Sequence, residues 1–272
     1  MNTVETLERL RVTPGRPAEL ARRDPADRLG FGDKQGGSER LAELVEELRV
    51  LSNRLWAEGR RSLLLVLQGL DASGKDGTIK HVFTGVNPQG CRVHSFKAPA
   101  GAELDHDYLW RIHAACPQHG EVGIFNRSHY EDVVTVRVRK LAPEHVWKRR
   151  PAHIREFERT LADEGTTLVK AYLNISYEEQ GKRFQARIAN PEKAWKFRRE
   201  DLDDRALFND YIAAYDEALT ETSTQVAPWY VVPADRKWVR NVAVAELLVA
   251  SLRTMDPELP PADPELKSLQ IV

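Results

Sequence analysis

The stretch RSLLLVLQGLDASGKDGTIKHVF, residues 61–83, decides which fold this chain is expected to adopt. It begins with an apolar run too short for a helix, passes through a glycine-rich turn and ends in a helical pattern. In the turn, Gly69, Gly74 and Lys75 match the G-x-x-x-x-G-K pattern of a phosphate-binding loop. Such a loop needs glycines because backbone amides must converge on phosphate oxygens, and the next helix adds its positive dipole end. The segment therefore predicts strand, phosphate-binding loop and helix; the alternative is a glycine turn that carries a lysine by coincidence.

The loop differs from the ATP- and GTP-binding version at one position. Asp76 stands where that version has the Ser or Thr that holds magnesium, Thr78 follows two residues later, and Asp71 lies inside the loop. A carboxylate repels phosphate unless a metal ion lies between them, so we expect a Mg²⁺ ion held partly by carboxylates, with Mn²⁺ as its substitute. Alternatively, Asp71 caps the loop by bonding its backbone.

Four further apolar segments have the character of strands, and helical patterns separate them. The strands are expected at 91–98, 122–126, 166–175 and 229–234, and the helices near 102–116, 142–163, 176–189, 205–222 and 235–254. Continuously apolar strands that alternate with helices are typical of a parallel sheet covered on both faces. We therefore predict an α/β three-layer sandwich with a parallel sheet of about five strands.

The N-terminal part of the chain has two sections. Residues 1–37 are rich in Arg, Asp, Pro and Gly, and we expect them to form an irregular extension on the surface. After it, apolar residues at spacings of three and four predict a long helix over 38–57. The apolar face of this helix must pack either on its own domain or on another subunit.

The composition excludes several classes of protein. Forty Lys and Arg against 41 Asp and Glu give a formal charge of −1, which excludes a globally basic nucleic-acid coat. Two cysteines, Cys91 and Cys116, cannot form a disulfide scaffold or a structural zinc site. The longest apolar run is too short to cross a bilayer, and the first ten residues carry acids instead of the basic segment of a signal peptide. We expect a cytoplasmic protein that binds neither membrane nor nucleic acid.

A second group of polar residues follows the predicted strand 122–126. Asn126, Arg127, Glu131 and Asp132 should lie at the carboxyl edge of the sheet, where open α/β sheets bind ligands. There Arg127 can grip a phosphate through its planar fork, unless it only pairs with Asp132 across a turn. Either acid could complete the metal site or orient an acceptor phosphate, and Asp132 is the preferred metal ligand.

The loop GLDASGKDGT (69–78), followed by FNRSHYEDV (125–133), resembles the second family of polyphosphate kinases. The resemblance continues along the chain and covers roughly residues 40 to 255. The motifs are short, but their order and spacing are specific to the family. The residues of both motifs are similar to those of the branch that phosphorylates nucleoside mono- and diphosphates. Other branches usually carry Trp-Tyr-Asn-Arg where this chain has His-Tyr-Glu-Asp at 129–132.

The resemblance implies a P-loop kinase fold related to that of thymidylate kinase. It implies a kinase domain over 38–256 with a helical lid at about 176–205, followed by a C-terminal tail at 257–272. The implied reaction is Mg²⁺-dependent transfer of the terminal phosphoryl group between inorganic polyphosphate and nucleotides, from AMP to ADP and from ADP to ATP, with guanine nucleotides as further candidates. We also expect a homo-oligomer.

Two alternative functions remain at this point. One is an ATP-dependent nucleoside-monophosphate kinase, against which the Asp at position 76 argues. The other is a non-catalytic polyanion-binding protein that uses local basic segments, 137–159 and 182–205. Such a protein would have no use for the loop lysine or for a metal site.

The lid offers two arginines in a suitable spacing. Arg183 and Arg187 lie four residues apart, so we expect them to share a helical face and point at one ligand, meeting the transferring group on closure as an arginine finger does. Trp195 and Phe197 either stack on a base or, as more often, anchor the packing. His129 is assigned a positioning role, because transfer between ionised phosphates needs no general base.

The predicted site residues fall into three groups. The catalytic group is Asp71, Lys75, Arg127 and Arg187. The phosphate- or substrate-binding group is Gly69, Ala72, Ser73, Gly74, Lys75, Asp76, Gly77, Thr78, Lys80, Asn126, Arg127, His129, Glu131, Arg183 and Arg187. The predicted metal ligands are Asp71 and Asp132.

Overall fold

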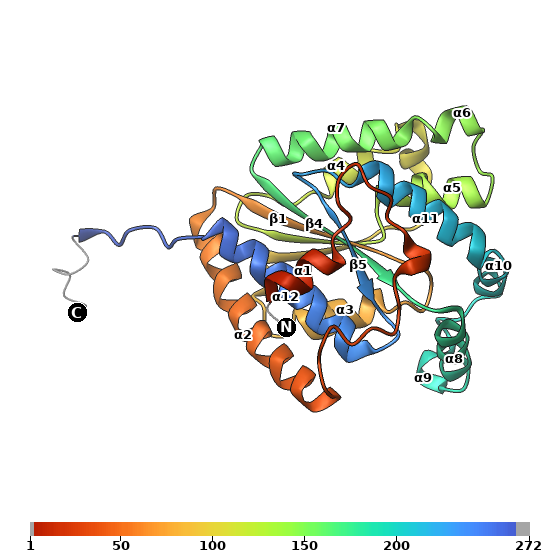
Figure 1. Ribbon diagram of the computed structural model, residues 1–272. Helices are drawn as coiled ribbons and strands as arrows, with labels where there is room; N and C mark the ends of the chain where they lie inside the picture. The colour runs from red at the N-terminus through yellow and green to blue at the C-terminus, as the bar shows by residue number, and fades with distance from the viewer. Residues whose placement is uncertain (1–2, 265–272) are drawn as a thin grey trace.

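The computed structural model describes residues 3–264, and within them five strands form a single, wholly parallel sheet in the order β2–β3–β1–β4–β5 (Figure 1). The strands are β1 (Ser62–Gln68), β2 (Cys91–Ser95), β3 (Val122–Asn126), β4 (Thr166–Asn174) and β5 (Trp229–Pro233). Every residue of the central strand β1 is buried, which explains its continuously apolar sequence. The predicted parallel α/β sheet is confirmed.

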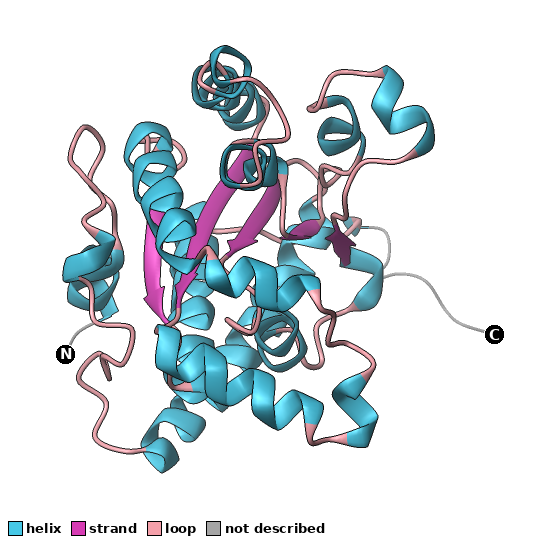
Figure 2. Ribbon diagram, turned by 90° about the vertical axis from the view of Figure 1, so that its right-hand side faces the viewer, coloured by secondary structure: helices cyan, strands magenta, loops and turns pink. Residues whose placement is uncertain are grey.

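Helices cover both faces of the sheet and make a three-layer sandwich (Figures 1 and 2). One face carries α2 (Lys34–Glu58), α3 (Lys75–Val82) and α12 (Lys237–Met255). The other carries α4 (Trp110–Ala114), α5 (Val134–Val138), α6 (Glu144–Trp147), α7 (Arg150–Asp163) and α11 (Phe208–Thr222). The apolar side of α2 is buried against α12, so this long helix packs on its own domain.

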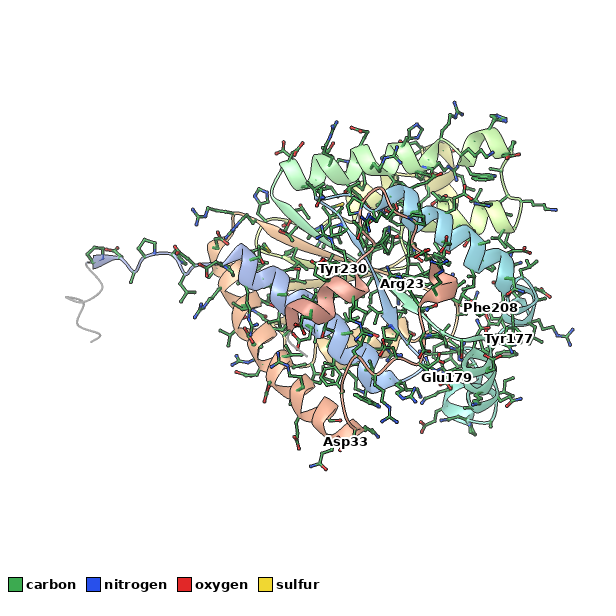
Figure 3. The ribbon with its side chains drawn as sticks, in the orientation of Figure 1. Arg23, Asp33, Tyr177, Glu179, Phe208 and Tyr230 are labelled. Carbon is green, nitrogen blue, oxygen red and sulfur yellow. The ribbon has the colours of Figure 1, made fainter. Side chains whose placement is uncertain are left out.

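The N-terminal segment differs from the irregular surface extension that was expected. It contains α1 (Thr3–Leu10) and a short 3₁₀ helix, Leu20–Arg22. Five of its apolar side chains are buried: Leu10, Val12, Ala18, Leu20 and Leu29. Val12 donates its N–H to the carbonyl of Trp229 (2.8 Å), and the guanidinium of Arg23, labelled in Figure 3, binds the carbonyl of Leu10 (3.0 Å). The sequence did not signal this burial because the apolar residues stand singly, without a periodic pattern.

Several predicted boundaries also shift. Helix α2 begins at Lys34, four residues early, because the Asp33 side chain accepts a hydrogen bond from the Gly36 amide and caps it. The helix expected over 142–163 is divided into α6 and α7, with a proline at the start of α7. Three further 3₁₀ helices connect the elements: Pro88–Gly90, Gly101–Asp105 and His129–Asp132.

The segment expected to form the lid consists of α8 (Tyr177–Ile188), α9 (Pro191–Ala194) and α10 (Glu200–Ala206), which project together at one end of the sheet (Figure 1). At its base, the rings of Tyr177 and Phe208 meet edge to face with centroids 5.2 Å apart (Figure 3). Along the described part of the chain, every helix is too short or too polar to cross a membrane.

Candidate active site

The glycine-rich loop joins β1 to α3 in a conformation that side chains would block. Gly69 and Gly74 have φ of 144° and 107°, and Ala72 also has a positive φ of 65°. A Cβ on Gly74 would lie only 1.8 Å from Nη1 of Arg240, and one on Gly69 would lie 2.9 Å from the carbonyl oxygen of Leu173. Glycine is required at both positions for the tight turn and for the close approach of neighbouring groups.

Lys75, the first residue of α3, reaches back across this loop. Its Nζ donates to the carbonyl oxygens of Gly69 (2.6 Å) and Leu70 (3.3 Å), and the residue is 8% exposed. An ammonium group has three N–H donors, so one of them is left for a ligand. Burial, and then the charge of Arg127, lower the pKa of Lys75 below its usual value. An anion in the loop would complete the hydrogen bonding of this lysine and neutralise its charge.

Arg127 lies directly beyond β3, in the register that places Asn126 beside Leu67 of β1. Its Nη2 donates to Oδ1 of Asp71 at 2.6 Å, so Arg127 pairs with the loop rather than with Asp132. Burial alone would raise the pKa of Asp71, but the charges of Arg127 and Lys75 outweigh it and hold that pKa below its usual value. Asp71 is therefore an ionised carboxylate between two cations.

Arg127 also has an unusual backbone. Its φ is +62°, although it carries a full side chain, and its N–H donates to the carbonyl of Leu67 (3.1 Å). A non-glycine residue in this region is strained and persists only where its surroundings hold it. Here the surroundings include Asp71 of the glycine-rich loop, which accepts a hydrogen bond from the guanidinium.

The two acids of the second motif face different ways. Glu131 contributes to the electrostatic environment of Lys75 and Arg127, and it accepts a hydrogen bond from Thr135 Oγ1 (2.7 Å). Asp132 instead pairs with Arg111 (3.7 Å) and Arg150 (3.6 Å). The preference for Asp132 as the partner of Asp71 is therefore not supported by the geometry, because the 3₁₀ turn at 129–132 directs consecutive side chains in different directions.

Asp76 links the loop to the lid segment. Its carboxylate accepts hydrogen bonds from Asn126 Nδ2 (2.8 Å) and Lys196 Nζ (3.3 Å). Burial would raise the pKa of Asp76, but these two partners hold it below its usual value. Lys196 was not among the predicted site residues.

The two lid arginines do not share a ligand direction, in contrast to the prediction. Arg183 donates from Nη1 to the carbonyls of Ala72 (3.0 Å) and Ser73 (2.9 Å), and from Nη2 to two carbonyls at residues 234–235. Its Nε donates to Glu179 (2.8 Å). Because these donors are occupied within the protein, Arg183 holds the loop in place. Arg187 lies 3.6 Å from Asp201, and its positive charge helps to lower the pKa of Asp71, so it acts on the loop electrostatically from the lid segment.

His129 is not at the phosphate side of the site, which corrects its assignment to phosphate binding. It is 0% exposed, and its Nε2 lies 3.4 Å from Glu158 in a buried cluster. In that cluster Lys170 Nζ binds Glu158 (2.6 Å) and the hydroxyl of Tyr130 (2.9 Å). His129 is the first residue of the 3₁₀ turn that Ser128 caps, and its side chain is directed into the core.

The remaining loop residues have distinct placements. Thr78 and Ser73 are fully buried, and within residues 3–264 neither hydroxyl has a hydrogen-bond partner. Lys80 is exposed on α3. Two residues that sequence reasoning missed also touch the loop: Gln180 Nε2 donates to the carbonyl of Asp71 (3.0 Å), and Arg240 Nη1 donates to the carbonyl of Ser73 (3.1 Å). Both residues lie on helices far from the loop in the sequence, and no local sequence pattern predicts their contact with it.

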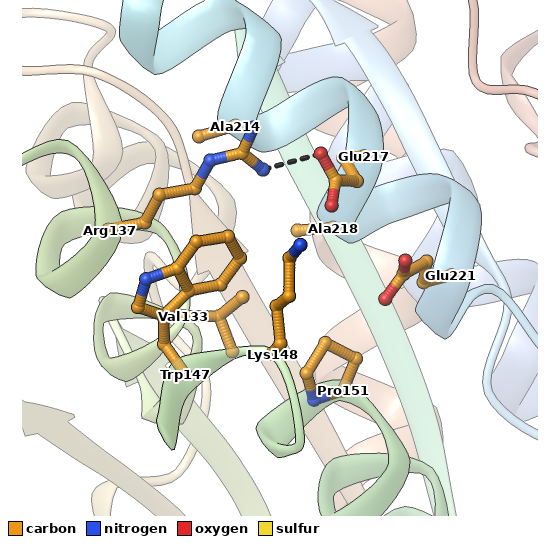
Figure 4. A pocket seen from close by; sticks show the side chains of 9 residues that line it. All are labelled: Val133, Arg137, Trp147, Lys148, Pro151, Ala214, Glu217, Ala218 and Glu221. Atoms are coloured by element: carbon orange, nitrogen blue, oxygen red, sulfur yellow. Dashed lines mark hydrogen bonds and ion pairs between the residues drawn. The ribbon is translucent and has the colours of Figure 1, made fainter. Parts of the chain in front are cut away.

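Two cavities lie near these elements. One, of about 130 Å³, is enclosed by α5, α6, α7 and α11 and contains the ion pair of Arg137 and Glu217 (Figure 4); no residue of the glycine-rich loop lines it. The other, of about 350 Å³, is lined by Asp132 together with aromatic and basic residues that include Tyr108 and Arg150. The larger cavity therefore adjoins the second motif.

Comparisons with known proteins agree with this geometry. A family model described as polyphosphate kinase 2 (PPK2) matches residues 32–260. The chain is 52% identical to the AMP/ADP-polyphosphate phosphotransferase of Meiothermus ruber, over 98% of this chain and 99% of that one. It is 40% identical to the ADP-polyphosphate phosphotransferase of Rhodopseudomonas palustris, over 94% and 93% of the two chains. The crystal structure of polyphosphate kinase 2 from Arthrobacter aurescens superposes with a TM-score of 0.91 at 44% identity, covering 95% of this chain and 92% of that one.

Proposed function

The chain belongs to the polyphosphate kinase 2 family, and we propose that it transfers the terminal phosphoryl group between inorganic polyphosphate and nucleoside mono- and diphosphates. The observation that carries this proposal is the meeting of Lys75, Asp71 and Arg127 at the carboxyl ends of β1 and β3. The loop that they line has the features of a phosphate-binding loop. Its two cations, Lys75 and Arg127, have fewer anionic partners within the protein than they can bind.

Polyphosphate is the partner assigned to the loop and the lid. The loop supplies backbone amides and Lys75, and the lid supplies Arg187 and Lys196, both of which already interact with loop carboxylates. A chain with a charge on every phosphate can bridge these groups. On its binding, Arg187 exchanges its present neighbour, Asp201, for phosphate oxygens.

The nucleotide is assigned to the cavity beside Asp132. Its volume of about 350 Å³ falls within the range of small-molecule sites, and it opens next to the second motif. The ring of Tyr108, with the guanidinium of Arg150 stacked 4.6 Å from its centre, offers a flat surface for a base. Burial raises the pKa of Asp132 although Arg150 and Arg111 oppose this, and its Oδ2 has no hydrogen-bond partner in the described chain.

Magnesium fits the residues around the loop. Asp71 receives the Arg127 hydrogen bond on Oδ1 only, and Glu131 lies close enough to affect the same cations. Mg²⁺ in phosphoryl-transfer sites is held by one or two carboxylates together with substrate phosphates, which is the donor set that these residues provide. Asp71 and Glu131 would hold it; when bound, it neutralises charge on the phosphate oxygens.

The chemistry asked of the protein is modest. The attacking phosphate oxygen is already ionised, so no side chain has to remove a proton. The loop amides and Lys75 align the donor, Arg127 holds the phosphates that react, and Arg187 adds charge when the lid closes. Rate enhancement then comes from position and electrostatics.

A product analysis tests this function. The purified protein is incubated with Mg²⁺, long-chain polyphosphate and AMP, ADP, GMP or GDP separately, and nucleotides are resolved by chromatography. We expect AMP to yield ADP and ATP, and ADP to yield ATP. A parallel reaction with AMP and ATP as donor tests the ATP-dependent kinase. Absence of new phosphoanhydride from every acceptor would contradict the proposal; cytoplasmic location and homo-oligomeric state stay predictions.

A further inference from the structure

A buried guanidinium lies directly beneath the glycine-rich loop. Arg240, in the first turns of α12, is 2% exposed. Its Nη1 donates to the carbonyl of Ser73 (3.1 Å), and its Nε and Nη2 donate to Oδ1 of Asn241 (3.2 and 2.9 Å). The space beside Gly74 is filled by this group, since a Cβ there would meet Nη1 at 1.8 Å. The cation is thus packed against the side of the loop that faces the protein.

This cation has no negative partner. Among residues 3–264, no carboxylate forms an ion pair with Arg240, whereas its charged neighbour Arg183 pairs with Glu179 at 2.8 Å. Lys237 adds further positive charge, and burial followed by Arg183 and Arg240 lowers the pKa of that lysine. Burying an uncompensated charge is costly, so the position requires an explanation beyond packing.

The carbonyl of Ser73 connects this cation to the ligand side. It accepts hydrogen bonds from both Arg240 (3.1 Å) and Arg183 (2.9 Å). In a trans peptide the carbonyl and the following N–H point in opposite directions, so the N–H of Gly74 points away from the two arginines. Within the described chain, that N–H makes no hydrogen bond. Donation to the carbonyl also polarises the peptide and strengthens its N–H as a donor.

We propose, on the basis of the function proposed above, that Arg240 is a positioning residue that orients and polarises the Ser73–Gly74 peptide and that its counter-charge is the phosphate bound on the opposite side of the loop. The unpaired buried charge is then a feature of the free protein that ligand binding relieves. Burial and the neighbouring Arg183 lower the pKa of Arg240 to about 9, in accord with a cation that lacks an anion. A purely structural role would make shape, rather than charge, the important property of this side chain.

Binding of inorganic tripolyphosphate, measured by calorimetry, tests the inference without turnover. Arg240→Gln keeps polar donors but removes the charge. Arg240→Lys keeps the charge but loses the planar arrangement of guanidinium donors. Arg253→Gln is the matched control, because Arg253 lies on the same helix, about 20 Å further along, where it pairs with Glu47. Melting curves of the free proteins, followed by circular dichroism, verify that each variant is folded.

We expect Arg240→Gln to weaken tripolyphosphate binding about tenfold, Arg240→Lys to stay within about threefold of the natural chain, and Arg253→Gln to be unchanged. Tripolyphosphate should also raise the melting temperature less in Arg240→Gln than in the natural chain, with Arg240→Lys between them and Arg253→Gln equal to the natural chain. Equal affinities of the Gln variant and the natural chain would overturn the inference. So would an equal loss in the Lys and Gln variants, since charge would not then be the cause.

Two further readouts keep the test decisive. If Arg240→Gln does not fold, the Gly74 amide resonance of the Lys variant is compared with that of the natural chain upon addition of tripolyphosphate; an unshifted amide in both proteins contradicts donation from Gly74. In turnover with polyphosphate, a positioning role raises KM of Arg240→Lys or Arg240→Gln more than it lowers kcat. Tripolyphosphate binding that obeys these expectations in a protein without transfer activity would refute the proposed function and leave the role of Arg240 standing.

Discussion

Two buried lysines of this protein, Lys75 and Lys170, occupy opposite kinds of environment. Lys170, on β4, is 0% exposed and has a complete set of partners: Glu158 (2.6 Å), the hydroxyl of Tyr130 (2.9 Å) and the carbonyl of Thr222 (2.8 Å). Lys75 is nearly as buried, but its two hydrogen bonds go to loop carbonyls. One cation is neutralised inside the protein, and the other is not.

The difference separates a structural cation from a functional one. Lys170 and Glu158 join β4 to α7, and the three N–H donors of Lys170 are all used within the protein, so none is left for a ligand. Lys75 keeps one N–H donor and faces a loop of glycines. A buried cation whose hydrogen bonds are incomplete therefore indicates where an anion binds. Burial or a lowered pKa alone would not distinguish the two lysines, because both have these properties.

Replacing Lys75 by Met should produce the largest effect on activity. We expect transfer from polyphosphate to ADP to fall by at least about four decades, or about 5 kcal/mol in transition-state stabilisation. The free energy of unfolding should change less than for a replacement of Lys170, because Lys75 donates to two carbonyls and forms no direct ion pair whose carboxylate would be left buried and uncompensated. Luciferase detection of ATP measures the first quantity and urea unfolding the second.

The control for this prediction is Lys148→Met, since Lys148 lies on the surface beside Glu144. Its activity should equal that of the natural chain. A Lys75 variant with more than about one per cent of the natural turnover would remove this lysine from the mechanism.

Replacing Lys170 by Met should affect mainly the stability of the protein, whereas replacing Lys75 affects mainly its activity. Glu158 would be left charged and buried without its cation, which costs about 3–5 kcal/mol of stability. Urea unfolding should show this loss, and adding Glu158→Leu to the Met variant should restore part of it, because the orphaned carboxylate is then gone. A loss below about 1 kcal/mol would show that Lys170 is no structural anchor.

Arg187→Ala should lower turnover by about two decades, equal to about 2.7 kcal/mol, and leave the fold intact. The reason is that the positive charge of Arg187 already acts on Asp71 from the lid segment, and we expect it to meet the phosphate when the lid closes. Arg183→Ala is the informative comparison, because Arg183 holds loop carbonyls and its loss should reduce stability together with turnover. Near-normal turnover of the Arg187 variant would exclude it as an arginine finger.

The sheet and the loop were predictable because their signals are local. The apolar run before Gly69 and the spacing to Lys75 lie within a few residues, and parallel pairing of buried strands follows from their composition. The placement of single side chains was less accessible. Glu131 and Asp132 are neighbours in sequence, but the 3₁₀ turn sends one to the loop and the other to Arg111.

Long-range contacts explain the other differences. Arg183 and Arg187 occupy one helix face, as expected. However, Arg183 already donates to the loop carbonyls of Ala72 and Ser73, so these donors are no longer available for a ligand. Arg240 lies more than 160 residues after Ser73, and the hydrogen bond between them depends on how α12 packs under the loop. Helical spacing cannot reveal such a contact, since it contains no information on the partner.

The smallest effect concerns the pH dependence contributed by Asp71. Its pKa in the folded protein lies below the ordinary value of 3.8, because Arg127 and Lys75 outweigh the effect of burial. The ionised pair should thus add about 0.5–1 kcal/mol of stability above pH 4–5, the scale of a partly exposed ion pair, and lose it as the pH falls through the folded pKa. Asp71→Asn removes this contribution but keeps an oxygen for Arg127.

The measurement is the difference in unfolding free energy between the natural chain and Asp71→Asn from pH 7 to pH 3, in EDTA to exclude bound metal. The difference should be constant at pH 5–7 and shrink below about pH 4. If the Asn variant is instead more stable at neutral pH, the carboxylate is strained by its burial in the free protein. The ion pair of Asp71 with Arg127 would then not stabilise the free protein, in contrast to the pair of Lys170 with Glu158.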